Sequence, residues 1–201
     1  MNLSLTNPRS PKWQDYRRFS PRRRPSLPLW RWLTLDGSLT QALTELAEGD
    51  LNVQVLTQGV ARARAEEYRR LGIKPHQLCL IREVVLKGQG QDWVFARSLI
   101  PLPHLKGDFR RLGKQGTTPL GHFLFSHRFI TRSPFEVARI SPQSGYTPST
   151  LLQEQIGYGR RSIFCFNHRH ILVSEVYLPA FVHKLTRVET LLPPIEPICY
   201  D

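Results

Sequence analysis

The stretch LCLIREVVLKGQGQDWVFARSLIP, residues 78–101, places two apolar runs on either side of a glycine-containing segment. Both runs are rich in β-branched and aromatic residues, and Gly88 and Gly90 between them are typical of the turn of a β-hairpin. Residues 159–179 repeat this pattern, with the turn NHRH between GRRSIFCFN and HILVSEVYLP. The sequence therefore predicts an antiparallel sheet built around two hairpins.

Further elements are predicted on both sides of the first hairpin. Residues 38–48 form an amphipathic pattern with Ser38 and Gln41 as a capping box and Gly49 as a stop, which predicts a helix. Residues 51–60 alternate between apolar and polar as in a strand, and residues 61–72 fit a short helix or a continued strand. Residues 128–140 predict a strand that is broken at Pro134, and residues 141–156 resemble a flexible insertion. The predicted fold is a single α+β domain, with an antiparallel sheet of about six strands flanked by short helices.

The positive charge is unevenly distributed along the 201 residues. The net charge is +12, and residues 1–30 contribute 7 − 1 = +6 of it. Because the first segment is rich in Pro, Ser and Arg without periodicity, we expect a disordered basic arm over residues 1–28, a domain over 29–182 and a C-terminal tail over 183–201. A transit peptide is an alternative for the arm, although three prolines after Ser20 argue against the amphipathic helix that such a peptide needs.

Several classes of protein are disfavoured by composition. No apolar run approaches the roughly 18 residues of a membrane span, so we expect a soluble intracellular protein without an integral membrane segment. Cys79, Cys165 and Cys199 are far apart and odd in number, which argues against a disulfide framework and a zinc site. His168 and His170 flank Arg169 in a predicted turn and are interpreted as solvated, so no metal site is predicted.

Two charged residues interrupt apolar strand faces. Period two places Arg82 in the middle of the row Leu78, Leu80, Val84 and Leu86, and it places Glu175 in the row Ile171, Val173 and Tyr177. A buried guanidinium suits a carboxylate ligand, and a desolvated carboxyl group suits general acid chemistry. The alternatives are that Arg82 extends to water or that the two residues neutralise each other. Arg97, Arg160 and Arg161 are interpreted as solvated strand ends that assist an anionic ligand at most.

The stretch TTPLGHFLF, residues 117–125, predicts the start of a helix. A proline in the first turn loses no hydrogen bond there, and a preceding threonine can act as N-cap, which leaves the backbone N–H of Leu120 as the first free donor. Leu39 is likewise the first residue of the helix predicted after Ser38. Free N–H groups at helix starts suit a small anion. Together with Arg82 and Glu175, these two donors predict a carboxylate site without a cofactor.

The motifs IREVVL, ARSLIP, LGKQGTTPLGHFLF, YGRRS and LVSEVYLP, in this order, resemble the pattern of chorismate–pyruvate lyases. The resemblance covers about residues 30–181 and is stronger to the cyanobacterial and plastid branch than to the proteobacterial one. It implies a six-stranded antiparallel sheet with the ligand enclosed beneath two flaps. It also implies conversion of chorismate to 4-hydroxybenzoate and pyruvate without metal or cofactor, as a first step toward plastoquinone or ubiquinone.

Carried over residue by residue, the resemblance assigns the ligand-binding arginine to Arg82 and the acidic residue to Glu175. It assigns the two backbone N–H contacts to Leu39 and Leu120. Arg82 and Glu175 are the expected catalytic residues, and all four are expected to bind substrate. The expected partners are chorismate and 4-hydroxybenzoate, with no specific nucleic acid, and the expected state is a monomer in the cytoplasm, or in the plastid stroma if the source is a photosynthetic eukaryote.

Two other classes of function are weighed against the lyase. The same fold serves as the effector-sensing half of certain bacterial regulators, which would make this chain a non-catalytic module for small carboxylates. A regulator needs a winged helix of about 60 residues before the sensor, and the 30-residue arm is too short for one. An RNA-binding protein would interleave aromatic and basic residues on a strand face, whereas the paired strands here carry apolar rows.

Overall fold

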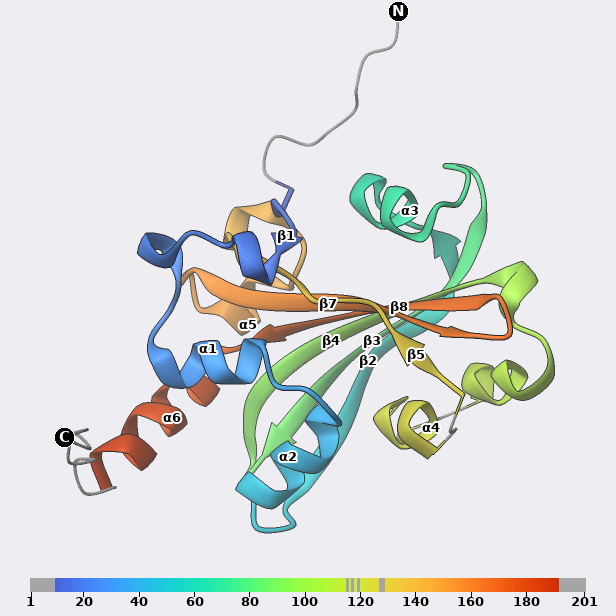
Figure 1. Cartoon of the computed structure of the whole chain (residues 1–201). Coiled ribbons are helices and arrows are strands. Elements are labelled where there is room, and N and C mark those ends of the chain that lie inside the picture. Colours follow the sequence, from blue (N-terminus) through green and yellow to red (C-terminus); the bar gives the residue numbers. More distant parts are fainter. Residues whose placement is uncertain (1–9, 115, 117, 119, 127–128, 192–201) are drawn as a thin grey trace, which may run out of the picture.

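The computed structural model in Figure 1 describes residues 10–114, 116, 118, 120–126 and 129–191. Within these ranges, eight strands form one antiparallel sheet in the order β1-β6-β7-β8-β4-β3-β2, with β5 paired to β7. The strands are β1 (Gln14–Asp15), β2 (Leu51–Arg62), β3 (Leu78–Gly88), β4 (Gln91–Pro101), β5 (Thr131–Arg132), β6 (Glu136–Ile140), β7 (Gly157–Phe166) and β8 (Arg169–Tyr177). The predicted α+β fold is confirmed: six strands have five residues or more, and β1 and β5 are two-residue additions.

The helices are mostly short and lie around this sheet. They are α1 (Leu27–Leu33), α2 (Leu39–Leu46), α3 (Ala65–Leu71), α4 (Leu120–Ser126), α5 (Ser149–Leu152) and α6 (Pro179–Leu191), with 3-10 turns at Tyr16–Arg18, Pro21–Arg23, Leu102–His104, Gly107–Lys114 and Pro142–Ser144. The helix predicted after Ser38 is confirmed as α2, and the ambiguous segment 61–72 contains helix α3, which ends at Gly72 with φ 68°. None of the helices in the described ranges is long and apolar enough to cross a membrane.

Both predicted hairpins are present and both close with two-residue turns. Gln89 and Gly90 join β3 to β4 with φ angles of 51° and 74°, and Asn167 and His168 join β7 to β8 with φ angles of 47° and 60°. Two consecutive positive φ angles match the right-handed twist of the paired strands. Gly88, which the sequence suggested as a turn residue, is instead the last residue of β3.

The two faces of the sheet are covered by different elements (Figure 1). One face carries Val84 and Leu86 and packs against α1, α2 and α6 at one end and α4 at the other. On the opposite face, Cys79 and Ile81 pack against Leu71 of α3, and a second group packs against residues 141–152. The α2 and α4 helices contact each other on the first face, so they cover part of the space beside the strands.

The expectation of a disordered arm is wrong for residues 10–28, while residues 1–9 lie outside the described residues. β1 pairs with β6, and Trp13 contacts Tyr146 edge to face with ring centroids 5.5 Å apart. Phe19 is only 2% exposed and packs against Trp30. The aromatic residues between the arginines explain this outcome, because each buries a large apolar surface that the composition of the segment obscures.

Two further boundaries differ from expectation. Residues 141–156 are packed into the core through Tyr146 and Leu152, rather than forming a flexible insertion. The expected start of a tail at residue 183 falls inside α6, which contacts α1 and whose Leu185 is buried in the core cluster that α1 and α2 also form. In both segments a few apolar residues among many polar ones supply the packing, and such sparse spacing gives no clear period. Residues 192–201 of the expected tail lie outside the described residues.

Candidate active site

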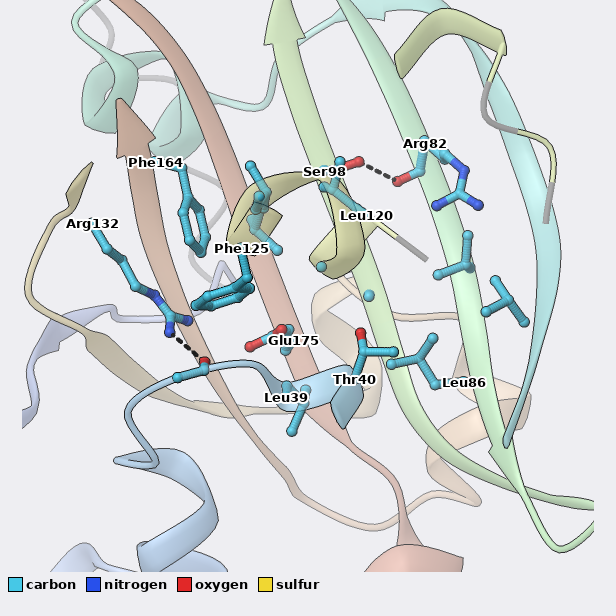
Figure 2. Close-up of a pocket in the computed structure, with 17 residues that line it drawn as sticks. Leu39, Thr40, Arg82, Leu86, Ser98, Leu120, Phe125, Arg132, Phe164 and Glu175 are labelled. Atoms are coloured by element: carbon cyan, nitrogen blue, oxygen red, sulfur yellow. Dashed lines mark hydrogen bonds between the residues drawn. The ribbon is translucent and has the colours of Figure 1, made fainter. Parts of the chain in front are cut away.

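A cavity lies between the sheet and the amino ends of α2 and α4 (Figure 2). About 580 Å³ of space between the surrounding atoms belongs to it, and part of this space is open solvent. Its walls are mostly apolar. The lining residues are Gly37, Leu39, Thr40, Val53, Arg82, Val84, Leu86, Ala96, Ser98, Leu120, Gly121, Leu124, Phe125, Arg132, Phe164, Val173 and Glu175. All four residues that the sequence predicted for the site therefore meet in one cavity.

Arg82 lies on β3 and is buried, with 6% of its surface exposed. Its Nη2 donates to the backbone carbonyls of Gly116 (2.8 Å) and Thr118 (3.4 Å), while its Nε is buried without a hydrogen-bond partner. Among the described residues, no carboxylate forms an ion pair with Arg82, and burial lowers the pKa of its guanidinium. A buried cation with a free donor in an apolar cavity favours binding of an anionic ligand.

Glu175 lies on β8 and forms an ion pair with Arg160 of β7, with 2.6 Å between Oε2 and Nε. These two residues face each other directly across the strands. The Arg160 side chain is fully buried, and its Nη1 also donates to the carbonyls of Trp32 and Leu35. Burial alone would lower the pKa of Arg160, but the adjacent Glu175 carboxylate raises it. Glu175 is thus fixed by Arg160 and does not neutralise Arg82.

The strand register separates Arg82 from Glu175. Arg82 lies opposite Ser98 of β4, and Ser98 lies opposite Val173 of β8, so Glu175 is two strands away and two residues along. With strands about 4.8 Å apart and a rise of about 3.4 Å per residue, the two Cα atoms are roughly 12 Å apart. Figure 2 shows both side chains at the cavity, with space between them. A small ring with polar groups at opposite ends suits this spacing.

The two helix starts meet at the cavity. Ser38 caps α2 by accepting a hydrogen bond from the backbone N–H of Gln41, and Leu39 is the first helical residue. Leu120 is the first residue of α4, so neither Leu39 nor Leu120 has an intrahelical partner for its N–H. A Cβ atom on Gly121 would lie 2.8 Å from Thr40 Oγ1, which shows how closely the helices approach. Pro119 lies outside the described residues, while Thr118, the threonine before it, is exposed and its carbonyl accepts a hydrogen bond from Arg82.

Arg132 is a cavity residue that sequence reasoning missed. It lies on β5, and its guanidinium stacks 4.1 Å from the ring centroid of Phe135 and 4.8 Å from that of Phe164. Its Nε donates to Ser162 Oγ (2.8 Å) and its Nη1 to the Gly37 carbonyl (3.3 Å). A two-residue strand before a proline carries no periodic pattern. The sequence therefore contains no signal that would have placed this side chain.

The interpretation of Arg97, Arg160 and Arg161 as solvated strand ends is wrong. All three are buried, because each has a carboxylate partner inside the fold. On the face opposite the cavity, Arg97 pairs with Glu67 of α3 and with Glu83 across the β3–β4 ladder. Arg161 pairs there with Glu136, while Arg160 faces the cavity side and holds Glu175. A pattern of polar and apolar residues counts arginine as polar and therefore as exposed. It cannot reveal carboxylate partners that come from elements distant in the sequence.

Among the described residues, no cysteine or histidine is named in the lining of the cavity. Cys79 and Cys165 are free thiols, while Cys199 lies outside the described residues. Within the described part of the chain, no three His, Cys, Asp or Glu residues are grouped so that they could hold a metal ion. His104 accepts a hydrogen bond at Nδ1 from the backbone N–H of His170, so this histidine pair is bonded within the fold.

Comparison with known proteins adds to this geometry. The sequence pattern described as chorismate lyase matches residues 12–188. A Marinobacter nauticus protein named probable chorismate pyruvate-lyase is 38% identical over 156 residues, which are 78% of this chain and 79% of the relative. A Pseudomonas aeruginosa strain UCBPP-PA14 protein of the same name is 40% identical over 149 residues, covering 74% of this chain and 82% of the relative.

Among solved structures, a GntR-family transcriptional regulator from Bacillus cereus resembles the chain with a TM-score of 0.50. The match covers 65% of this chain and 93% of the regulator, at 9% sequence identity. At that identity the likeness concerns the fold alone.

Proposed function

Because the chain belongs to the chorismate lyase family, we propose that it converts chorismate to 4-hydroxybenzoate and pyruvate. The observation that carries this proposal is the cavity in which Arg82, which has no ion pair with any described carboxylate, lies across a mostly apolar space from Glu175. Chorismate is a ring with a carboxylate at one end and a hydroxyl group at the other. Its product, 4-hydroxybenzoate, keeps both groups in the same relative positions, which suits the aromatic ring precursor of a quinone such as ubiquinone or plastoquinone.

Arg82 and the backbone N–H groups of Leu39 and Leu120 bind the ring carboxylate in this proposal. The Nε of Arg82 is buried without a partner, and both N–H groups belong to the first residues of helices that border the cavity. Three donors that converge from three elements fix the ligand in one orientation. Apolar residues such as Val84 and Leu86 then pack against the ring.

Glu175 lies at the hydroxyl end and handles the proton that the ring loses. The C–H bond at the carbinol carbon breaks and its electron pair completes the aromatic ring. The ether C–O bond at the neighbouring ring carbon also breaks. The enolpyruvate oxygen keeps the electron pair of this C–O bond as enolpyruvate leaves. Enolpyruvate becomes pyruvate by taking a proton at its methylene carbon. Since aromatisation drives the reaction, the protein mainly orients the substrate and stabilises charge, and we expect no cofactor.

The test is incubation of the purified full chain with chorismate. We expect 4-hydroxybenzoate and pyruvate in equal amounts, the first followed by chromatography and the second by reduction with lactate dehydrogenase. A parallel reaction with a chelator should proceed at the same rate. A folded protein that binds 4-hydroxybenzoate but forms neither product would contradict the lyase proposal and favour a carboxylate-binding module.

A further inference from the structure

The cavity holds a second guanidinium group that the binding of 4-hydroxybenzoate does not require. The guanidinium group of Arg132 packs against the rings of Phe135 and Phe164. Its Nε donates to Ser162 Oγ, and its Nη1 donates to the Gly37 carbonyl. None of the ion pairs among the described residues includes Arg132. Burial lowers its pKa to about 10, although the charge of Glu175 acts in the opposite direction.

The strand register and one hydrogen bond connect Arg82 with the side chain of Arg132 across the sheet, although Arg132 itself pairs with Phe164, two residues along β7 from Ser162. Arg82 of β3 faces Ser98 of β4, which faces Val173 of β8, which faces Ser162 of β7. The Nε of Arg132 donates to the hydroxyl group of Ser162, at the far end of this row. Figure 2 shows the same arrangement, with the two arginines on opposite sides of the lining residues. The cavity is therefore positively charged at both ends.

Glu175 does not account for the charge of Arg132. Glu175 lies two residues along β8 from Val173, and its Oε2 accepts a hydrogen bond from Arg160 at 2.6 Å. Arg132 and Arg160 both stack on the ring of Phe135, and the carboxylates that act on both are Glu175, which is paired with Arg160, and the exposed Asp36. Among the described residues, neither carboxylate forms an ion pair with Arg132. A guanidinium kept beside another guanidinium, in apolar surroundings, is an unfavourable arrangement unless an anion joins it.

Substrate and product of the proposed reaction differ in one anionic group. Chorismate carries a ring carboxylate and a second carboxylate on its enolpyruvyl group, whereas 4-hydroxybenzoate carries only the first. We propose that Arg132 binds the enolpyruvyl carboxylate, an inference that rests on the proposed lyase function. Arg82 then holds the part that becomes 4-hydroxybenzoate, and Arg132 holds the part that becomes pyruvate. As the ether C–O bond breaks, its electron pair moves onto the fragment that Arg132 binds, so this cation stabilises the leaving group.

The test compares substrate with product in Arg132→Met. We expect kcat/KM for chorismate to fall by at least about 100-fold, as for loss of a charge-assisted hydrogen bond in a dry site. The affinity for 4-hydroxybenzoate, measured by calorimetry, should change by less than about threefold. Arg82→Met should weaken both. A matched control is Arg139→Met, because Arg139 is exposed on β6 and should leave both quantities unchanged.

Two outcomes would overturn the assignment. Equal losses for substrate and product in Arg132→Met would mean that the residue supports the cavity as a whole, and no loss for either would mean that it does not touch the ligand. If Arg132→Met does not fold, Arg132→Lys keeps the charge and should show the same selective loss to a smaller extent. If the unaltered protein forms no product, the lyase proposal fails, yet calorimetry with chorismate and 4-hydroxybenzoate still shows whether Arg132 discriminates between them.

Discussion

At the level of single residues, the partners of Arg82 and Glu175 determine what their removal does. Arg82 donates to backbone carbonyls and has no carboxylate partner within the part of the chain that the structure describes, whereas Glu175 compensates the charge of the fully buried Arg160. Breaking a buried ion pair from one side typically costs about 3–5 kcal/mol, because the remaining charge stays buried. Glu175 is therefore tied to stability in a way that Arg82 is not.

We expect Glu175→Gln and Arg82→Ala to differ in every measurement. Glu175→Gln should lower turnover by roughly 10² to 10⁴, the range for lost acid–base catalysis, while it still binds 4-hydroxybenzoate. It should also lower the melting temperature more than Arg82→Ala. Arg82→Ala should abolish binding of both substrate and product. Calorimetry, steady-state kinetics and thermal unfolding test these expectations.

The double variant is the control for an interaction between the two residues. Because they belong to separate hydrogen-bond networks roughly 12 Å apart, their effects on the free energy of unfolding should add to within about 0.5 kcal/mol. A double variant that regains the stability lost in each single one would show that Arg82 and Glu175 form an ion pair in solution. That result would contradict both the geometry and the proposed site.

At the level of elements, the first hairpin depends on a glycine outside its turn. A Cβ atom on Gly88 would lie 2.2 Å from the ring of Trp93, which is buried. Gly88→Ala should therefore lower the free energy of unfolding by at least about 1–3 kcal/mol, the usual cost of overpacking. Gly59→Ala is the matched control, since Gly59 lies on the edge strand β2 with no atom within 4 Å of its added Cβ. Chemical denaturation that finds equal losses for both would contradict the packing argument.

The junction of α2 and α4 offers a second test at this scale. Gly121→Ala places a Cβ atom 2.8 Å from Thr40 Oγ1, so either the Thr40 side chain or the two helix starts must shift, and we expect the helix starts to separate slightly. We expect the affinity for 4-hydroxybenzoate to fall by roughly tenfold, because the N–H groups of Leu39 and Leu120 no longer converge on one carboxylate. Adding Thr40→Ala removes the clashing atom. The double variant should therefore bind 4-hydroxybenzoate almost as tightly as Thr40→Ala alone. If calorimetry finds that the double variant is still much weaker than Thr40→Ala, the helices do not act through this contact.

Sequence patterns predicted the elements better than the charges between them. Period two placed Arg82 and Glu175 on the cavity face, and capping chemistry placed Leu39 and Leu120 at helix starts. These are local properties of the chain. The pairing of Arg160 with Glu175 depends on strand register, which a periodic pattern does not specify. Arg132 depends in addition on the path of the chain around Pro134, so its place in the cavity could not be predicted.

At the level of the whole molecule, the first described residues act as part of the domain rather than as an appendage. β1 extends the sheet beside β6, and Trp13 and Phe19 pack against residues from later in the chain, on two different sides of the sheet. Arg24 stacks on Trp30 with 4.4 Å between its guanidinium carbon and the ring centroid. The composition of this basic segment suggested a part separate from the domain. Its aromatic residues instead pack into the core on both faces of the sheet.

Removing residues 1–24 should consequently destabilise the protein by several kcal/mol, since the deletion exposes the surfaces that Trp13 and Phe19 cover. Phe19→Ala isolates one of these contacts and should cost about 3–5 kcal/mol, the range for a buried phenylalanine. Leu27→Ala is its control, because Leu27 is 60% exposed at the start of α1 and should change the free energy of unfolding by less than about 0.5 kcal/mol. Urea denaturation followed by tryptophan fluorescence measures all three. A truncated chain with the midpoint of the full chain would mean that the segment does not pack on the domain in solution.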